Sequence, residues 1–269
     1  MNEASAATPA LFDSHCHLGL DSLREDLENV LARARDGALQ HIVDIGISVA
    51  TSEQAQARGL ALSQSELQLH PSAGLHPCDC AEHQGQFSEI AELAAHERCV
   101  AIGETGLDLY WDSVPLAVQR ASLDKHIELG RALGKPLVLH CRDAWEELFE
   151  QLAEQAPIHG VLHCFTGDRQ EAERCLELGL MVSFGGPLTY KGRRNDPLRE
   201  AAAAVPEDRL LIETDAPFLP PQPWRGKRNE PAYVRATFDK LCDLRGAEPG
   251  QLAERLMQNS LRFFGLDAD

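Results

Sequence analysis

Short apolar runs alternate with longer amphipathic segments along most of the chain. Eight of these runs are rich in Val, Ile and Leu and are bounded by polar or turn-forming residues, a pattern typical of buried strands. They cover residues 11–17, 41–47, 67–75, 100–104, 136–141, 160–164, 180–184 and 210–215. We therefore predict eight buried strands.

The segments between these runs carry apolar residues at helical spacing. In residues 22–36, Leu23, Leu27 and Val30 fall on one stripe, and Gly37 follows as a stop signal. The same pattern predicts further helices over residues 51–63, 87–96, 115–133, 143–154 and 168–178. Residues 231–264 predict two helices, separated around Pro249 and Gly250.

The predicted strands and helices alternate along the chain in enough units to form a closed barrel. Repeated strand–helix units predict a parallel sheet with helical crossovers, and eight of them fit a (β/α)₈ TIM barrel of the α/β class. The alternative, an open doubly wound sheet, favours a Gly-rich phosphate turn after the first strand. Here that strand ends in His-Cys-His. We predict one barrel domain over residues 11–269, after a tail formed by residues 1–10.

The composition is that of a globular protein and does not by itself indicate a function. Hydrophobic residues make up 43% of the 269 residues and charged residues 25%, as in ordinary globular proteins. Residues 1–10 lack the apolar run of a secretory signal, and no apolar stretch reaches the roughly 18 residues of a membrane span. We expect a soluble, cytoplasmic monomer with no membrane association and no obligate protein partner.

Eight cysteines in such a chain predict buried thiols rather than a disulfide framework. Cys16, Cys141 and Cys164 each follow a histidine in a predicted strand. Since neighbouring strand residues point to opposite faces, we expect these sulfurs to lie on the helix side. Cys78 and Cys80 form a C-x-C that can bind metal, but without a second pair the signal is weak.

Ligand-type side chains close several of the predicted strands. In a barrel, residues at the carboxyl ends of the strands converge at one mouth, where catalytic groups lie. Burying several polar groups there for packing alone is costly. The candidates are His15, His17, Glu104, His140, His163 and Asp215.

This set is larger than one tetrahedral ion needs, so we expect two divalent ions sharing a carboxylate. Imidazole and carboxylate ligands suit ions such as Zn²⁺, Mg²⁺ or Mn²⁺. Paired ions about 3.5–4 Å apart activate water for attack on an ester. Glu104 lies between the two groups of histidines in strand order, so we predict it as the bridge. Asp215 is predicted to bind one ion and to orient the water.

Two further carboxylates are expected to support this cluster. Asp13 and Glu213 share a face with His15 and Asp215 but lie deeper, where they can hydrogen-bond to ligands. Asp108 is expected to cap its loop, with a role at the barrel mouth as the alternative.

The motifs FDSHCH, GLHP, IGETGLD, LHCRDA, HCFTG, IETDAPFL and KRNEP together resemble the TatD family of metal-dependent deoxyribonucleases, which have amidohydrolase-like barrels. The resemblance runs from Phe12 to about Pro231. It implies that one ion is held by His15, His17, Glu104 and Asp215, and the other by Glu104, His140 and His163. It also implies that Glu104 replaces the carbamylated lysine of other binuclear barrel hydrolases.

Two other motif residues have two interpretations each. His76, in GLHP, is expected either to contact a substrate phosphate or to cap its loop by a hydrogen bond. Arg142, next to His140, can hold a phosphate through its guanidinium or pair with Asp143 or Glu146.

The net charge of −17 disfavours a non-specific coat on nucleic acid. Two basic segments follow the last two strands: the KGRR segment (residues 191–194) and the RGKR segment (residues 225–228). Tyr190 and Trp224 beside them can stack bases. We expect Arg193, Arg194, Lys227 and Arg228 to bind substrate, with ordinary solvated loops as the alternative.

The resemblance implies a 3′–5′ exonuclease on single-stranded DNA. A second hypothesis is hydrolysis of an amide or ester, including deacylation of an aminoacyl-tRNA. A third is a scaffold with a relic site, although the complete ligand set argues against it. The basic segments favour a phosphate-bearing substrate.

Overall fold

Eight parallel strands form one sheet in the order of the chain in the computed structural model, which describes residues 8–63, 65–111 and 113–266. They are β1 Leu11–Cys16, β2 Leu39–Asp44, β3 Gln68–Ala73, β4 Ala101–Asp108, β5 Leu137–Arg142, β6 Gly160–Leu162, β7 Met181–Phe184 and β8 Leu210–Ile212. Backbone contacts just past β8 close the ring, since Cys16 bridges Ala216 and the His17 N–H donates to Ala216 O at 2.8 Å. The predicted (β/α)₈ barrel is confirmed.

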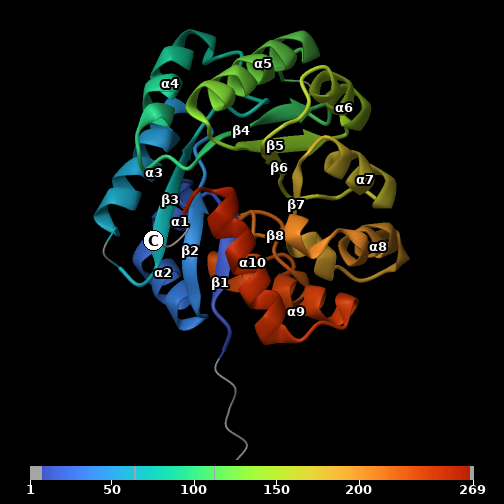
Figure 1. The fold of residues 1–269 in the computed structure, drawn as a ribbon. Coiled ribbons are helices and arrows are strands. Elements are labelled where there is room, and N and C mark those ends of the chain that lie inside the picture. Colours follow the sequence, from blue (N-terminus) through green and yellow to red (C-terminus); the bar gives the residue numbers. More distant parts are fainter. Residues whose placement is uncertain (1–7, 64, 112, 267–269) are drawn as a thin grey trace, which may run out of the picture.

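Helices surround this barrel (Figure 1). They are α1 Asp21–Arg24, α2 Leu27–Asp36, α3 Val49–Ala61, α4 Phe87–Ala95, α5 Leu116–Leu133, α6 Trp145–Ala153, α7 Arg169–Glu177, α8 Asp196–Ala204, α9 Val234–Arg245 and α10 Pro249–Phe263. Short 3₁₀ helices are η1 Gln84–Gln86, η2 Gly186–Thr189, η3 Arg193–Asn195, η4 Glu207–Arg209, η5 Gln222–Trp224 and η6 Pro231–Tyr233. The predicted break before α10 is confirmed, because Gly246 ends α9 in the left-handed conformation and Pro249 opens α10.

Two helix predictions need correction. Residues 22–36 form α1 and α2 rather than one helix, because Asp26 leaves the helical conformation and accepts hydrogen bonds from Asn29 and Arg33. The helix predictions also missed α8. Its buried face is formed by Leu198, Ala201 and Ala202, which recur at helical spacing, and Pro197 in its first turn is a start signal, so the sequence did carry the pattern of a helix here.

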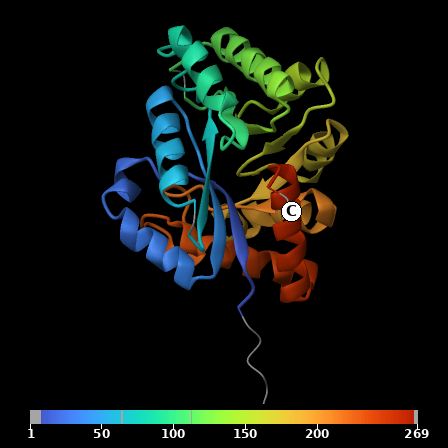
Figure 2. The ribbon, with the colours of Figure 1, turned by 60° about the vertical axis from the view of Figure 1, so that its left-hand side comes forward.

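The barrel interior is closed at its amino end by α10. The ring of Phe264, just after that helix, stacks on Phe12 of β1 with centroids 5.8 Å apart. Both rings belong to an interior cluster with Val43, Val138 and Leu211. Figure 2 shows α10 beside β1, in agreement with the contacts between these elements. The aromatic rings of α10 and the residue after it therefore pack against the amino ends of the strands.

A second and larger apolar core lies between the barrel and its helices. Cys16 belongs to it together with Leu23 of α1 and Val30 of α2, and Cys141 packs against it. All eight cysteines are free thiols, as predicted, but only five are buried, and Cys78, Cys141 and Cys164 are half-buried. The expected position of Cys16 and Cys141 on the helix side is confirmed, whereas Cys164 is half-buried and does not belong to this core.

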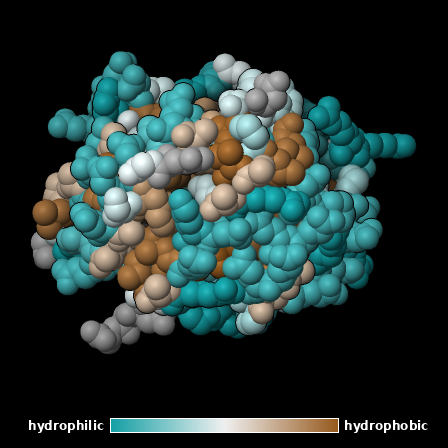
Figure 3. Space-filling view, turned by 90° about the horizontal axis from the view of Figure 1, so that it is seen from above, coloured by the Kyte–Doolittle hydropathy of each residue, from teal (hydrophilic) through white to brown (hydrophobic). Residues whose placement is uncertain are grey.

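The outer surface over α4 and α5 is mainly hydrophilic, with smaller apolar patches (Figure 3). Among the described residues, no helix combines the length and apolar character needed to cross a membrane.

Candidate metal centre

The six predicted ligands come from five strands and meet at the carboxyl end of the barrel. The sequence placed each at a strand end, which is only partly right. Glu104 lies in the middle of β4, because β4 pairs with β5 as far as Asp108 after a register shift between Ile102 and Thr105. His163 follows β6 directly, and Asp215 lies three residues beyond β8.

Glu104 joins the histidines into two groups. Its Oε1 lies 2.9 Å from Nδ1 of His140 and 2.9 Å from Nε2 of His163. Its Oε2 lies 3.4 Å from Nε2 of His15 and 3.5 Å from Nε2 of His17. The two oxygens of one carboxylate therefore face different pairs of imidazoles.

Asp215 faces the first of these pairs. Its Oδ1 lies 3.4 Å from Nε2 of His17 and 3.7 Å from Nε2 of His15. The Asp215 N–H also donates to His15 O at 3.0 Å, so β1 and the turn after β8 are fixed to each other. The side chain is directed into the cluster from the seam of the barrel.

The carboxylates are held in their charged form. Burial by itself raises the pKa of Glu104, but the charges of His163 and His76 outweigh it and hold that pKa well below its usual range. Burial likewise raises the pKa of Asp215, and contacts with His17 and His15 more than compensate, so the pKa is lowered. Ionised carboxylates are the form that binds cations.

The donor atoms present fit divalent metal ions. Oε2 of Glu104 is buried without a hydrogen-bond partner in the described part of the chain, between Nε2 of His15 and Nε2 of His17. Leaving such atoms without a partner is costly, and a cation offsets that cost. Within the described ranges, three groups have donor atoms close enough for an ion: His15, His17 and Asp215; His76, Glu104 and His140; and His15, His163 and Glu213. None of these groups contains a cysteine.

His76 caps its loop, one of the two interpretations given for it, and it also lies beside Glu104. Its Nδ1 accepts the N–H of Cys78 at 3.2 Å, which caps the loop, and its Nε2 lies 3.4 Å from Glu104 Oε1. Burial lowers the pKa of His76, but the charge of Glu104 outweighs burial and raises it to about 9.

Three carboxylates support the ligands, as expected for Asp13 and Glu213. Asp13 accepts the N–H groups of Thr214 at 2.9 Å and His15 at 3.3 Å. Glu213 Oε1 lies 3.3 Å from Nδ1 of His163. Asp108 does more than cap its loop, because its Oδ2 also lies 2.9 Å from Nε2 of His140. Such partners fix the ring orientation of a ligating histidine.

Sequence reasoning missed the buried pair of Asp44 and Arg58. Asp44 ends β2 opposite Cys16 in register, and its Oδ2 accepts from Arg58 Nε at 2.6 Å. The pair therefore supports the segment that carries His15 and His17. The available signal was an aspartate inside a predicted strand, since a buried carboxylate requires a partner.

The residues predicted to contact substrate lie in different surroundings. Arg142 lies over the Tyr110 ring, 3.7 Å from its centroid, while Glu146 pairs with Arg174. Arg193, Arg194 and Lys227 are exposed. The loops after β7 and β8 are joined, since the Lys191 N–H donates to Gln222 Oε1 at 3.1 Å.

Arg228 has structural partners instead of a free guanidinium. It donates to Ser22 O at 2.7 Å and to Asp26 Oδ2 at 3.1 Å, and it lies 3.5 Å from Glu230 Oε2. Glu230 in turn pairs with Arg33 at 2.7 Å. This network accounts for Arg228, so the structure gives no reason to assign it to substrate.

The two aromatic residues of these segments are also partly used inside the protein. Trp224 stacks on Tyr233 with centroids 4.0 Å apart, and Arg225 lies 4.0 Å from the centroid of the Tyr190 ring. Each ring therefore already has one stacking partner within the protein.

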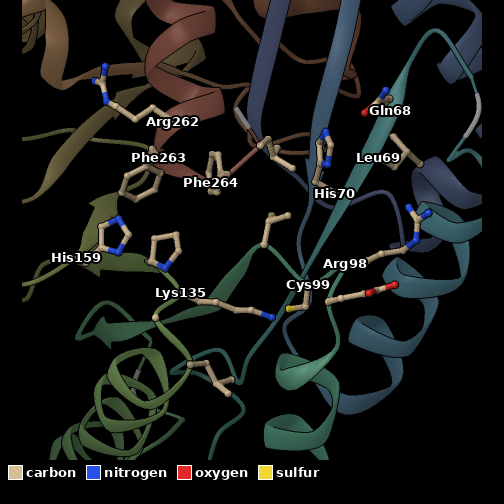
Figure 4. Close-up of a pocket in the computed structure, with 17 residues that line it drawn as sticks. Gln68, Leu69, His70, Arg98, Cys99, Lys135, His159, Arg262, Phe263 and Phe264 are labelled. Atoms are coloured by element: carbon tan, nitrogen blue, oxygen red, sulfur yellow. The ribbon is translucent and has the colours of Figure 1, made fainter. Parts of the chain in front are cut away.

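A cavity of about 620 Å³ lies away from this cluster, at the amino end of the barrel. Figure 4 shows His70, His159 and Phe264 among the residues around it. None of the predicted metal ligands lines it. Its position beside Phe264 separates it from the candidate centre.

Comparison with known proteins agrees with the fold and with a metal-dependent hydrolase. The family model described as TatD related DNase matches residues 12–265. The chain is 41% identical over 265 residues to the uncharacterized metal-dependent hydrolase YcfH of Escherichia coli, covering 96% of this chain and 97% of that protein. It is 35% identical over 264 residues to the 3′-5′ ssDNA/RNA exonuclease TatD of Citrobacter rodentium, covering 95% and 98%.

Among solved structures, YjjV, a TatD homolog from Escherichia coli K12, superposes with a TM-score of 0.85 at 31% identity, covering 96% of this chain and 98% of that one. The fold and the imidazole–carboxylate cluster define a metal-dependent hydrolase. The chain belongs to the TatD family.

Proposed function

We propose that this protein cleaves phosphodiester bonds in DNA, as a 3′–5′ exonuclease on single strands, with two divalent ions such as Zn²⁺, Mg²⁺ or Mn²⁺. The ligands proposed for one ion are His15, His17, Glu104 and Asp215. Those proposed for the other are Glu104, His140 and His163.

The observation that carries the proposal is the division of Glu104 between two pairs of histidines. Oε1 faces His140 and His163 at 2.9 Å each, and Oε2 faces His15 and His17 at 3.4 and 3.5 Å. One carboxylate with a separate set of imidazoles at each oxygen is the arrangement that a bridging ligand requires. When bound, ions at such a site polarise a phosphoryl oxygen and make water a nucleophile at neutral pH.

The chain's own groups then have distinct roles. Asp215, whose pKa is lowered, is a carboxylate at neutral pH, so its Oδ atoms can orient the attacking water and accept its proton. His76 and Arg142 are placed in the proposal as the groups that hold the phosphate. Arg193, Arg194 and Lys227, which are exposed on the loops after β7 and β8, attract the rest of the strand.

DNA as substrate rests on two supports. One relative carries the name of a 3′-5′ ssDNA/RNA exonuclease. The second is the exposed cations of the KGRR and RGKR segments in a chain whose net charge is −17. Hydrolysis of a small amide or ester has no use for these cations.

The direct test is digestion of single-stranded DNA labelled at its 5′ or its 3′ end, with Mg²⁺, Mn²⁺ or Zn²⁺ added in turn. The proposal expects a ladder of 5′-labelled products that shortens with time, immediate release of the 3′ label, and loss of both with EDTA. Internal cuts would overturn the exonuclease assignment. Activity confined to an aminoacyl ester or amide would overturn phosphodiester cleavage altogether.

A further inference from the structure

Large apolar side chains are exposed almost entirely on two loops of this protein. In the described part of the chain six such residues are exposed, and five lie in residues 109–111 and 218–219. Tyr110, Trp111 and Phe218 keep 53%, 55% and 50% of their surface in contact with solvent. The sixth, Leu60, lies on α3. Exposed apolar groups gathered in this way mark a binding surface.

Residues 109–111 are fixed directly to the metal centre. Oδ1 of Asp108 accepts the N–H of Tyr110 at 2.9 Å and the N–H of Trp111 at 3.0 Å. The other oxygen of the same carboxylate lies 2.9 Å from Nε2 of His140. Asp108 therefore connects the backbone of Tyr110 and Trp111 to His140, a candidate ligand. A shift of this carboxylate would disturb the imidazole of His140 as well.

Residues 218–219 are fixed to the opposite side of the cluster. The Phe218 N–H donates to Asp215 O at 2.9 Å, and Asn229 Nδ2 donates to Phe218 O at 2.6 Å. The Phe218 ring packs edge-on against the ring of His17, with centroids 5.9 Å apart. His17 and His140 face different oxygens of Glu104, so the two exposed surfaces flank the bridging carboxylate.

Positive charge accompanies the first surface. The guanidinium of Arg142 lies 3.7 Å from the centroid of Tyr110 and 5.8 Å from that of Trp111. The Leu109 N–H donates to Arg142 O at 2.9 Å, which holds the arginine beside the loop. Flat rings beside a cation are the combination that binds unpaired bases together with their phosphates.

We propose that Tyr110 and Trp111 on one side, and Phe218 on the other, stack the bases of an unpaired strand whose phosphodiester lies at the metal centre. This inference rests on the proposed function and specifies its substrate as a strand with free base faces. Bases in a duplex are already stacked on both faces, so these rings select single strands and frayed ends.

The test distinguishes binding of the bases from binding of the sugar–phosphate backbone. Binding of a fluorescein-labelled twelve-residue oligothymidylate is measured by anisotropy in EDTA, for the parent protein and for Tyr110→Leu/Trp111→Leu and Phe218→Leu. A strand of the same length made of abasic units is the second probe. Each lost stack should weaken oligothymidylate binding by roughly 5- to 100-fold. Binding of the abasic strand, which is weak already in the parent, should not change.

The controls keep ring loss apart from general damage. Tyr110→Phe retains the ring and should bind like the parent, and Leu60→Ala removes an exposed apolar group far from the loops in sequence and should do so too. Melting temperatures should stay unchanged, because the replaced rings are half exposed. KM for oligothymidylate, measured with Mn²⁺, should rise in parallel with the dissociation constant.

Unchanged oligothymidylate binding in both variants would overturn the proposal, and so would equal losses on the two probes. Loss of self-association with unchanged DNA binding would make the loops an interface between copies and would also overturn it. If the parent binds the oligothymidylate through these rings but never hydrolyses it, the stacking stands and the proposed nuclease activity fails. If it hydrolyses the strand while the variants bind normally, the reverse holds.

Discussion

Oδ2 of Asp108 lies 2.9 Å from Nε2 of His140, while Nδ1 of the same imidazole faces Oε1 of Glu104 at 2.9 Å. Asp108 therefore fixes the ring by accepting the Nε2 proton, which leaves the Nδ1 lone pair directed into the cluster. Burial lowers the pKa of His140, but its contacts with Asp108 and Glu104 more than offset this. The metal centre depends on this second carboxylate as well as on its ligands.

Asp108→Asn should weaken the site without unfolding the barrel. The amide places an NH₂ group opposite the His140 Nε2–H, or forces the other tautomer, so Nδ1 no longer presents a free lone pair. Loss of such an outer partner typically costs about 10- to 100-fold in metal affinity or activity. Titration of metal-free protein with Zn²⁺ or Mn²⁺ measures the affinity. Asp243→Asn, which removes an exposed carboxylate from α9, is the control, and equal affinities for both variants would contradict this role.

The exposed cations of the KGRR and RGKR segments should control strand binding. Arg193→Gln/Arg194→Gln/Lys227→Gln is expected to raise KM for single-stranded DNA about 10-fold or more while a small phosphodiester is hydrolysed as before. Each lost phosphate contact lowers the salt dependence of binding by about 0.7 in log–log slope on a single strand. The triple variant should therefore show a slope smaller by about 2. An unchanged KM and slope would mean that these segments are ordinary solvated loops.

Arg228 is the informative comparison within the same segment. Because it pairs with Asp26 and Glu230, Arg228→Gln should lower the melting temperature and leave the salt slope of DNA binding close to that of the parent. A large effect on the slope without loss of stability would return Arg228 to the substrate-binding set.

His126 should make folding sensitive to mild acid. Its Nε2 accepts the Leu75 N–H at 3.0 Å, just before His76, and burial, with a smaller contribution from Lys125, lowers its pKa to about 4 from a usual value of 6.5. Between these values the unfolded chain binds one more proton than the folded one, so stability is lost as pH falls from 6.5 toward 4.

His126→Gln should remove this part of the acid dependence. The free energy of unfolding should fall less steeply between pH 6 and pH 4.5, by up to about 1.4 kcal/mol per pH unit. Urea unfolding at several pH values measures the slopes. Parallel curves for parent and variant would show that His126 does not contribute.

The barrel could be predicted from the sequence because the apolar residues follow recognisable strand and helix patterns. The strands are largely buried and contain short apolar runs such as residues 137–139 and 210–212, whereas α2 and α5 carry apolar stripes. The prediction failed in two places. α8 was missed although Leu198, Ala201 and Ala202 recur at helical spacing, and the division between α1 and α2 depends on side-chain contacts of Asp26, among them an ion pair with the distant Arg228.

The candidate ligands could be identified from the sequence, because residues near the carboxyl ends of the strands of a barrel meet at one mouth. Their relative geometry could not be, since the register shift in β4 that sets Glu104 is a property of its pairing with β5. The side-chain partners were equally hidden. Nothing in the sequence indicates that Arg228 meets Asp26, or that Trp224 stacks on Tyr233 while Tyr110 and Trp111 stay exposed.

The most direct test of the account is the metal content of Glu104→Gln. Parent and variant are saturated with Mn²⁺ or Zn²⁺, freed of excess ion, and compared by elemental analysis, circular dichroism and hydrolysis of single-stranded DNA. We expect two ions per chain in the parent. In the variant we expect a folded barrel with fewer than two ions and at least a 100-fold loss of hydrolysis, because removing one charge weakens both groups of histidines. A variant that keeps two ions per chain and hydrolyses DNA like the parent would contradict the assignment of Glu104 as the shared ligand.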